Sequence, residues 1–235
     1  MGRLILVRHG KSEWNIQNIF TGWTDVDLAP EGKEEAKKVG EIIKENNIVI
    51  DICFSSYLKR AIHTAWILLD SAHQLHVDTH YHWKLNERHY GDWQGRNKNQ
   101  VLKELGEKAY WAIRRGYETP PPELSLEDDR HAIYDSNYET MDEKLLPKSE
   151  SLKDTQKRVV NYFYEAIAPE LAKNKTLLVS AHGNSIRALV GMLKGIPPEN
   201  MPQIKVETGI PIMYEFDSVL HLTADYVLSK VGSLS

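Results

Sequence analysis

Two histidine–glycine pairs are the residues of this chain whose types and positions are best suited to chemistry. His9-Gly10 follows an apolar run, Leu4 to Val7, and His182-Gly183 follows a second apolar run, Leu177 to Ala181. Histidine acts as an acid, a base or a nucleophile near neutral pH, and the glycine after it lets the backbone approach a ligand closely. A single histidine in such a place is more often an ordinary hydrogen-bonded residue, but two equivalent pairs, one flanked by Arg8, favour a shared site.

The apolar runs must form the strands that position these pairs. In an open α/β sheet, ligands bind beyond the carboxyl ends of the strands, so His9 and His182 meet if their strands are neighbours. Further strands are predicted at 50–54 and 211–216. Helices are predicted at 31–46, 99–115, 151–171 and 185–193. One more helix is predicted directly after Ser55 and Ser56, which are its candidate N-caps. This alternation predicts the α/β class, with a mostly parallel central sheet and helices on both faces.

The middle of the chain differs in composition from the rest. Residues 81–149 are rich in charged residues, Trp, Tyr and Pro, with one predicted helical stretch. We interpret them as an inserted lobe that covers the site, within a single domain of residues 1–235.

Composition excludes several classes of protein. The 235 residues carry a net charge of −4, which argues against general nucleic-acid binding, and the single cysteine, Cys53, excludes an internal disulfide. No apolar stretch approaches the ~20 residues that a membrane-spanning helix needs. We therefore expect a cytoplasmic protein with no membrane or nucleic-acid partner, and Cys53 as an inert core thiol.

Several segments together resemble a known family. Residues 6–15, Leu-Val-Arg-His-Gly-Lys-Ser-Glu-Trp-Asn, look like the signature of the histidine phosphatase superfamily. Segments 20–28, 58–64, 85–91, 114–116, 121–124 and 181–185 are similar to the cofactor-dependent phosphoglycerate mutases within it. The resemblance extends over nearly the whole chain and includes the substrate-specific segments.

The resemblance implies a set of catalytic residues. His9 is the expected nucleophile, taking a phosphoryl group on one ring nitrogen, and Glu87 is the expected general acid and base for the substrate hydroxyl. Arg8 and Arg60 are expected to grip the phosphoryl oxygens, and His182 to add a donor as an imidazolium. Such a clamp stabilises phosphoryl transfer without a metal.

The resemblance also implies a set of binding residues. Neutral donors are expected around the transferring phosphoryl group, and a charged set is expected to hold the substrate carboxylate and the second phosphate. The expected neutral donors are Ser12, Asn15, Thr21, Gly22, Gly183 and Asn184. The residues expected to hold the carboxylate and the second phosphate are Arg88, Tyr90, Lys98, Arg114 and Arg115.

Some of these residues have a plain structural alternative. Glu87 could form an ion pair with Arg88 or Arg60, and Arg114-Arg115 could be a solvated helix face, although the order of the family's motifs favours the functional interpretation. Four histidines lie close together in the sequence and suggest a metal cluster: His73, His76, His80 and His82. Their spacing matches no common zinc pattern, so loop or surface positions fit them better.

The chain departs from the family pattern at several places, including Asp92-Trp93, which replaces a small apolar pair after Gly91. Lys11 stands where glutamate is common, and adds a positive charge beside the site. Ala29 replaces the usual Ser or Thr before Pro30, which removes a helix cap worth about 1 kcal/mol. The chain ends shortly after Lys230, where many members continue into a Lys- and Gly-rich tail, and this predicts poorer exclusion of water.

The resemblance implies interconversion of 2-phosphoglycerate and 3-phosphoglycerate in glycolysis and gluconeogenesis. It further implies 2,3-bisphosphoglycerate as the priming cofactor, a phosphohistidine intermediate, no metal, and a dimer or tetramer. Three alternatives remain open: a bisphosphoglycerate synthase, a broad phosphomonoesterase on the same fold, and a non-catalytic phosphate-binding protein.

Overall fold

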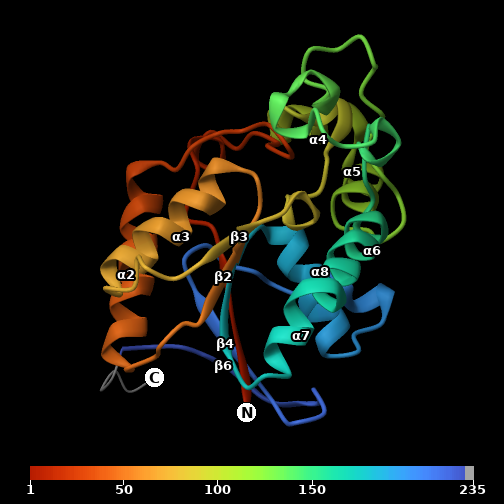
Figure 1. The fold of residues 1–235 in the computed structure, drawn as a ribbon. Helices are drawn as coiled ribbons and strands as arrows, with labels where there is room; N and C mark the ends of the chain where they lie inside the picture. Colours follow the sequence, from red (N-terminus) through yellow and green to blue (C-terminus); the bar gives the residue numbers. More distant parts are fainter. Residues whose placement is uncertain (231–235) are drawn as a thin grey trace.

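The centre of the fold is one six-stranded sheet. The computed structural model describes residues 1–230, and Figure 1 shows the sheet running up the middle of the molecule. Its strands are β1 (Gly2–Arg8), β2 (Ile52–Ser55), β3 (Thr79–Tyr81), β4 (Thr176–Ala181), β5 (Pro211–Phe216) and β6 (Leu222–Val227). They lie side by side in the order β3-β2-β4-β1-β5-β6.

Four neighbouring strands pair in parallel, and β5 alone runs in the opposite direction to the other five. β1 pairs with β4, β4 with β2, and β2 with β3 in the same direction, whereas β5 and β6 add antiparallel pairs beyond β1. The predicted mostly parallel sheet is therefore confirmed. The strands of the two histidine pairs are neighbours, with Arg8 opposite Ala181 in the register.

Helices cover both faces of the sheet because β1 is apolar on both sides. Leu4 and Leu6 join one buried cluster, and Ile5 and Val7 join the other. The second face is covered by α2 (Pro30–Glu45) and α3 (Lys59–Ser71), and the first by α6 (Leu152–Tyr162), α7 (Ala168–Leu171) and α8 (Gly183–Leu193). The predicted three-layer arrangement is confirmed (Figure 1).

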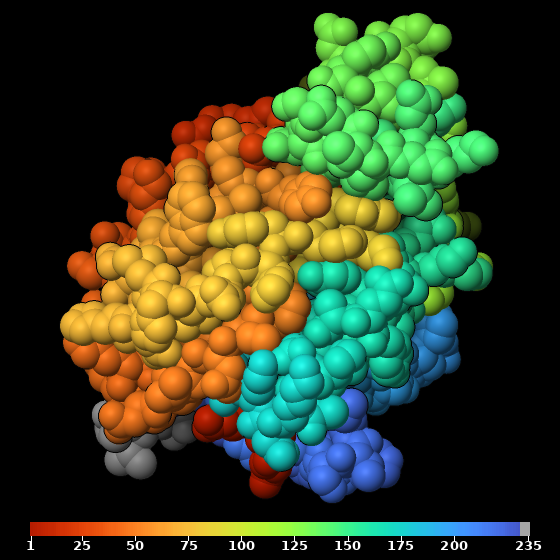
Figure 2. Space-filling model, viewed as in Figure 1, coloured from red at the N-terminus to blue at the C-terminus, as the bar shows by residue number. Residues whose placement is uncertain are grey.

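Short elements build the end of the molecule beyond the sheet. The α-helices here are α1 (Glu13–Ile16), α4 (Lys98–Leu105) and α5 (Glu107–Arg114). The 3₁₀ turns are η1 (Trp83–Leu85), η2 (Gly91–Trp93), η3 (Ala132–Tyr134), η4 (Ser136–Tyr138) and η5 (Glu143–Leu145), and η7 (Pro198–Gln203) lies near α8. The green residues of this region project from the upper right of the molecule in Figure 2.

Two predicted helices are broken. The stretch 99–115 divides into α4 and α5 because Gly106, with φ 74°, adopts a conformation that a helix cannot contain. The stretch 151–171 has a π-helical segment, η6 (Phe163–Ile167), between α6 and α7. Pro169 follows directly at the start of α7, and its missing N–H accounts for the changed hydrogen bonding.

The structure also tests the helix caps predicted from the sequence. Neither Ser55 nor Ser56 is an N-cap, since α3 begins after Leu58 without a side-chain cap. Ala29 lies before Pro30 and gives α2 no cap hydrogen bond, as predicted. The expected effect of the chain end falls on residues 231–235, outside the described residues. Within the described part, no helix is long and apolar enough to cross a membrane.

Candidate active site

The two histidines meet at the carboxyl ends of β1 and β4. The backbone N–H of His9 donates to the carbonyl of Ala181 at 2.9 Å, which continues the sheet by one residue. The rings of His9 and His182 then lie with their centroids 5.0 Å apart. The sequence prediction that the pairs share one site is met by this geometry.

His9 is a buried, neutral imidazole. Its Nδ1 lies 2.7 Å from the carbonyl oxygen of Gly10, and because a carbonyl only accepts, Nδ1 carries the hydrogen and Nε2 keeps its lone pair. Burial, with the positive charges of Arg60 and Arg8, holds the pKa of His9 well below its usual 6.5. The ring is thus ready for nucleophilic attack.

His182 is a neutral imidazole in the free protein. Its Nε2 lies 2.7 Å from the hydroxyl of Ser56, and its Nδ1 has no hydrogen-bond partner among the described residues. Burial and the nearby charge of Arg60 hold the pKa of His182 well below 6.5, and its role as an imidazolium donor to a bound phosphoryl group stays a prediction. Sequence analysis named Ser56 only as a helix cap, and missed this contact.

Arg60 and Arg8 approach the histidines from two elements. Arg60, in the first turn of α3, is fully buried and donates to the carbonyls of Gly22 and Thr24 at 2.7 and 3.0 Å. Burial lowers its pKa to about 10. Arg8 donates through Nη1 to the carbonyl of Val206 at 2.8 Å, while its buried Nε lacks a partner within residues 1–230. That free donor is available to an anion.

Glu87 lies between the lobe and the start of α8. Its Oε1 accepts from the backbone N–H of Arg88 at 2.8 Å and from that of Asn184 at 3.1 Å. Its Oε2 lies beside Gly183, where an added Cβ would stand 3.6 Å away. The carboxylate is 8% exposed and forms no ion pair with Arg88 or Arg60 in the described structure.

A small polar cavity of about 160 Å³ lies next to Glu87. Its lining contains most of the predicted binding side chains, and Asn184 donates to the Tyr90 hydroxyl across it at 3.1 Å. The lining residues are Arg8, Glu87, Tyr90, Lys98, Arg114, Arg115, Gly183, Asn184 and Arg187. Lys98, among these arginines, has its pKa lowered to about 8, first by burial and then by Arg114. Such a cavity attracts an anion of several negative charges.

Arg187 lines this cavity and was missed by sequence analysis. It lies on α8, four residues after Gly183, and bonds the Asn184 side chain and the carbonyl of Ile204. The sequence could have indicated Arg187, because a residue one helical turn after a predicted site glycine lies on the same face of the helix.

Arg88 was predicted to bind the ligand, but it is fully buried and does not line the cavity. Its Nη2 donates to the carbonyl of Ile113 at 3.2 Å, and its guanidinium stacks on Tyr90 with Cζ 4.7 Å from the ring centroid. Its place is behind the ring that forms the cavity wall, and its role in ligand binding stays a prediction.

Of four predicted neutral donors, one lines a pocket and three have structural surroundings. Ser12 is buried as the N-cap of α1, with its hydroxyl accepting from the N–H of Asn15 at 3.2 Å. Thr21 is buried, and Gly22, at φ 56°, turns its carbonyl toward Arg60. Asn15 alone of these four lines an outer pocket. The ligand roles of Ser12, Thr21 and Gly22 stay predictions.

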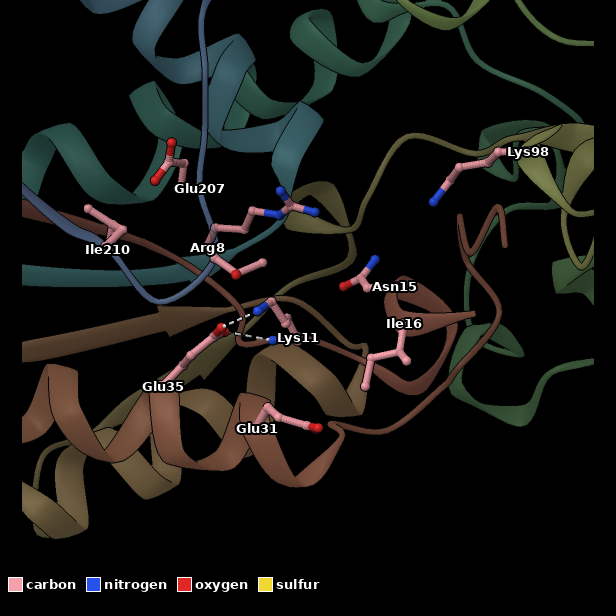
Figure 3. Close-up of a pocket in the computed structure, with 10 residues that line it drawn as sticks. Arg8, Lys11, Asn15, Ile16, Glu31, Glu35, Lys98, Glu207 and Ile210 are labelled. Atoms are coloured by element: carbon pink, nitrogen blue, oxygen red, sulfur yellow. Dashed lines mark hydrogen bonds and ion pairs between the residues drawn. The ribbon is translucent and has the colours of Figure 1, made fainter. Parts of the chain in front are cut away.

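The outer pocket joins the cavity through Arg8 and Lys98. Its lining also includes Asn15, Lys11 and three acidic side chains, Glu31, Glu35 and Glu207 (Figure 3). Lys11, expected to add a charge beside the site, is paired with Glu35 at 3.4 Å (Figure 3). Its positive charge is therefore largely offset in the free protein.

The other highlighted side chains have structural surroundings. His82 stacks on Tyr162 at 4.2 Å between centroids, and His80 stacks on Phe54 at 5.5 Å. Residues 1–230 contain no group of three or more His, Cys, Asp or Glu placed to hold a metal ion. Cys53 is fully buried, and burial raises the pKa of its thiol to about 12, as expected for an inert core residue.

Comparison with known proteins identifies the class to which this fold and site belong. Residues 4–132 and 124–218 match the Histidine phosphatase superfamily (branch 1). Solved structures share the fold: a mycobacterial glucosyl-3-phosphoglycerate phosphatase superposes with a TM-score of 0.73 at 21% identity, covering 97% of each chain. The chain belongs to the histidine phosphatase superfamily.

Relatives of higher identity narrow the comparison. The 2,3-bisphosphoglycerate-dependent phosphoglycerate mutase of Nautilia profundicola is 52% identical over 226 residues, covering 96% of this chain and 99% of its own. The enzyme of the same name from Staphylococcus carnosus is 46% identical over 228 residues, covering 97% and 100%. The family expected from the sequence is thereby confirmed.

Proposed function

We propose that this chain interconverts 2-phosphoglycerate and 3-phosphoglycerate through a phosphoryl group carried on His9, in glycolysis and gluconeogenesis. One observation supports this most strongly: the neutral, buried His9 directly follows Arg8, which lines one cavity together with Glu87 and four further cationic side chains. The identity to the two named mutases, over nearly their full length, supports the same activity.

His9 is the nucleophile in this proposal. Its Nδ1 is occupied by the carbonyl of Gly10, so Nε2 attacks phosphorus and the bond from phosphorus to the substrate oxygen breaks. Arg8 and Arg60 stabilise the negative charge on the phosphoryl oxygens. A phosphate dianion beside His182 favours its protonated form, which would restore the imidazolium donor during the reaction.

Glu87 moves the proton of the substrate hydroxyl. It protonates the oxygen that leaves phosphorus and, in the reverse transfer, removes the proton from the hydroxyl that attacks phosphohistidine. Its Oε1 is held by two backbone N–H groups, which leaves Oε2, on the Gly183 side, for this proton. Phosphohistidine would pass its phosphoryl group to the free hydroxyl of a phosphoglycerate, and the resulting bisphosphate would have to reorient inside the cavity before His9 accepts its other phosphoryl group.

The residues present fit 2,3-bisphosphoglycerate. The buried Nε of Arg8 lacks a partner among the described residues, and cations on the walls match a ligand with two phosphates and a carboxylate. Lys98, Arg114, Arg115 and Arg187 would hold its outer groups. When bound, this cofactor supplies the phosphoryl group that primes His9.

An enolase-coupled assay with the pure protein tests this proposal. We expect mutase activity that depends on 2,3-bisphosphoglycerate, with little release of inorganic phosphate. His9→Ala should lower kcat by more than about 1,000-fold, in line with removal of a nucleophile. Phosphate release faster than isomerisation would instead indicate a phosphomonoesterase.

We also propose one domain over residues 1–235, with the lobe at about 81–149, and a cytoplasmic protein that forms dimers or tetramers. Analytical ultracentrifugation at micromolar concentration tests the assembly. A single monomeric species would contradict it.

A further inference from the structure

The catalytic carboxylate lies on backbone that neither a helix nor a strand holds in place. Glu87 stands between η1 (Trp83–Leu85) and η2 (Gly91–Trp93), in a segment without regular backbone pairing. A proton-transfer group must keep its position to within about 0.5 Å, so this segment needs hydrogen bonds from elsewhere.

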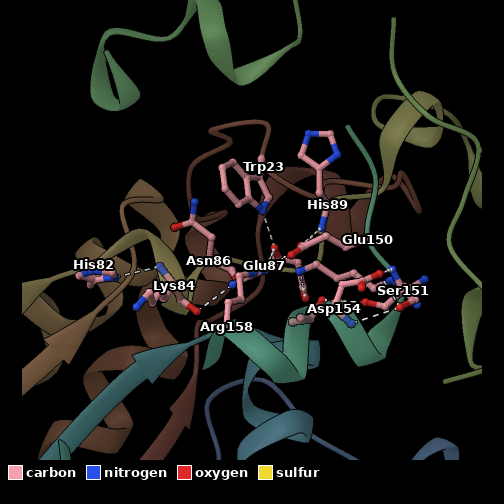
Figure 4. Close-up of polar contacts among 12 residues, drawn as sticks. Trp23, His82, Lys84, Asn86, Glu87, His89, Glu150, Ser151, Asp154 and Arg158 are labelled. Atoms are coloured by element: carbon pink, nitrogen blue, oxygen red, sulfur yellow. Dashed lines mark hydrogen bonds and ion pairs between the residues drawn. The ribbon is translucent and has the colours of Figure 1, made fainter. Parts of the chain in front are cut away.

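Arg158 of α6 supplies three of them. Its Nη1 donates to the carbonyls of Lys84 and Asn86 at 2.8 and 2.9 Å, and its Nη2 donates to the carbonyl of Glu87 at 2.9 Å (Figure 4). The side chain is only 8% exposed. It does not line the catalytic cavity, so its contact with the reaction runs through the Glu87 backbone.

Glu150 fixes Arg158 and grips the next part of the same segment. Its two carboxylate oxygens accept from Nε and Nη2 of Arg158 at 2.6 and 2.8 Å. These bonds use the remaining N–H groups, so all five guanidinium donors have partners. Glu150 also accepts from the N–H of His89 at 2.8 Å, and its own N–H donates to the His89 carbonyl at 2.9 Å.

Trp23 adds an independent contact from the N-terminal part of the chain. Its indole Nε1 donates to the carbonyl of Glu87 at 2.7 Å, and the guanidinium of Arg158 lies 5.7 Å from its ring centroid. The Glu87 carbonyl therefore accepts from two directions. Two donors on one oxygen restrict rotation of the peptide that carries the carboxylate.

A purely structural role fits this arrangement less well. Replacing a buried ion pair with apolar side chains is often neutral or stabilising, so stability alone does not explain a pair as deeply buried as Glu150–Arg158. The bonds of the pair to main-chain groups outside α6 all fall on Lys84, Asn86, Glu87 and His89. These hydrogen bonds hold the backbone on both sides of Glu87, the proposed general acid and base, and reach no other part of the site.

We propose that Arg158, held by Glu150 and assisted by Trp23, is the positioning residue that sets Glu87 for proton transfer. This inference rests on the proposed function, since it assigns Glu87 the role given there. It predicts a defect limited to the steps in which a proton moves, because the cations that bind phosphate are untouched.

The test compares substrates whose leaving groups differ in their need for a proton. An alkyl phosphate, such as phosphoglycerate, requires a general acid, whereas the aryl leaving group of 4-nitrophenyl phosphate departs as an anion. Arg158→Lys keeps the charge but loses the planar fork. We expect its kcat on phosphoglycerate to fall 30- to 100-fold with KM changed less than threefold. The aryl rate is taken as the first burst of nitrophenolate, which precedes the attack of water on phosphohistidine, and it should fall less than threefold.

Trp23→Phe is a milder second variant that keeps the aromatic packing and removes one hydrogen bond. It should lower the phosphoglycerate kcat 3- to 10-fold and leave the aryl rate unchanged. The matched controls are Arg3→Lys, whose Nε donates to Thr176 at the far end of β1, and Trp66→Phe, whose indole donates to Tyr81. Both controls should retain wild-type rates on both substrates.

An equal loss on both substrates in Arg158→Lys and Trp23→Phe would overturn the positioning role, as would full mutase activity in both variants. Failure of the proposed function has a different signature, namely a wild-type protein without mutase activity. In that case the release of phosphate from glycerol 2-phosphate, set against 4-nitrophenyl phosphate, gives the same comparison of leaving groups and tests the positioning role directly.

Discussion

Burial beside Arg60 and Arg8 keeps the His9 ring neutral, and its nucleophilicity depends on that. Arg60 is buried too, and Arg8 is half-buried with one N–H that lacks a partner among the described residues, so both guanidinium charges act strongly on a nearby anion. Phosphate affinity and histidine neutrality thus arise from one arrangement of side chains. The sequence indicated both histidines, but neither the neutral state of His182 nor its contact with Ser56 has a signal in local sequence.

Lys98 provides a pH-dependent test at the residue scale. Burial and the neighbouring Arg114 lower its pKa to about 8, so above this pH the free protein loses one positive charge from the cavity. We expect the KM for phosphoglycerate to rise several-fold between pH 7 and pH 9, while kcat changes less. Initial rates across this range measure it.

Lys98→Arg is the matched control for that prediction, since an arginine stays protonated throughout. Its KM should be nearly independent of pH over the same range. A KM that rises equally in the wild type and in this variant would show that another group controls the dependence.

The turn after β1 depends on close contact with α2. An added Cβ on Gly32 would stand 2.1 Å from the carbonyl oxygen of Lys11, and one on Gly10 would stand 2.1 Å from the carbonyl oxygen of Gly32. Both are backbone contacts, which side-chain rotation cannot relieve. The two glycines therefore let the first turn of α2 press against the residues that follow His9.

Gly32→Ala tests this contact at the element scale. Alanine favours the helix by about 1 kcal/mol, but the clash with Lys11 outweighs this gain. We expect a net loss of about 1–3 kcal/mol in the free energy of unfolding, with kcat reduced about tenfold as the His9 turn shifts. Urea denaturation and steady-state rates measure the two effects.

Lys33→Ala, an exposed neighbour on the same helix, is the control and should change stability by less than about 0.5 kcal/mol. Unchanged or increased stability of Gly32→Ala would mean that α2 can move away from the turn without cost.

The elements that sequence analysis predicted are those with clear burial patterns. β1 and β4 were predictable because continuous apolar runs are typical of strands buried on both faces. β3 has only three residues, and β6 is largely exposed at the sheet edge, so neither carries an apolar run. Gly106 could have indicated the break between α4 and α5, whereas Arg158 and Glu150 act through backbone contacts that no spacing rule reveals.

Over the whole molecule, a net charge of −4 coexists with a cavity lined by five cations: Arg8, Lys98, Arg114, Arg115 and Arg187. Acidic side chains elsewhere, including Glu31, Glu35 and Glu207 in the lining of the outer pocket, balance this concentration of charge. Net charge alone therefore gives no indication of the ligand.

Buried neutral histidines make the stability of the whole molecule depend on pH. Burial holds the pKa values of His9 and His182 well below 6.5 and lowers that of His89 to about 3. Below pH 6.5 the unfolded chain binds protons that these folded rings do not accept, so stability is present above this pH and falls as the pH drops. We expect a loss of about 2–3 kcal/mol between pH 6.5 and 5.5, measured by urea denaturation. Equal stability at both values would contradict the neutral rings.

The most direct measurement of the central proposal follows one phosphoryl group. The protein is incubated with 2,3-bisphosphoglycerate labelled in its phosphates, quenched in base to preserve phosphohistidine, and digested to locate the label. The proposed function predicts label on His9, none on His9→Ala, and a chase with unlabelled phosphoglycerate that moves it into phosphoglycerates within a turnover. A label that appears on another residue, or that leaves His9 as inorganic phosphate at the same rate with and without phosphoglycerate, would contradict it.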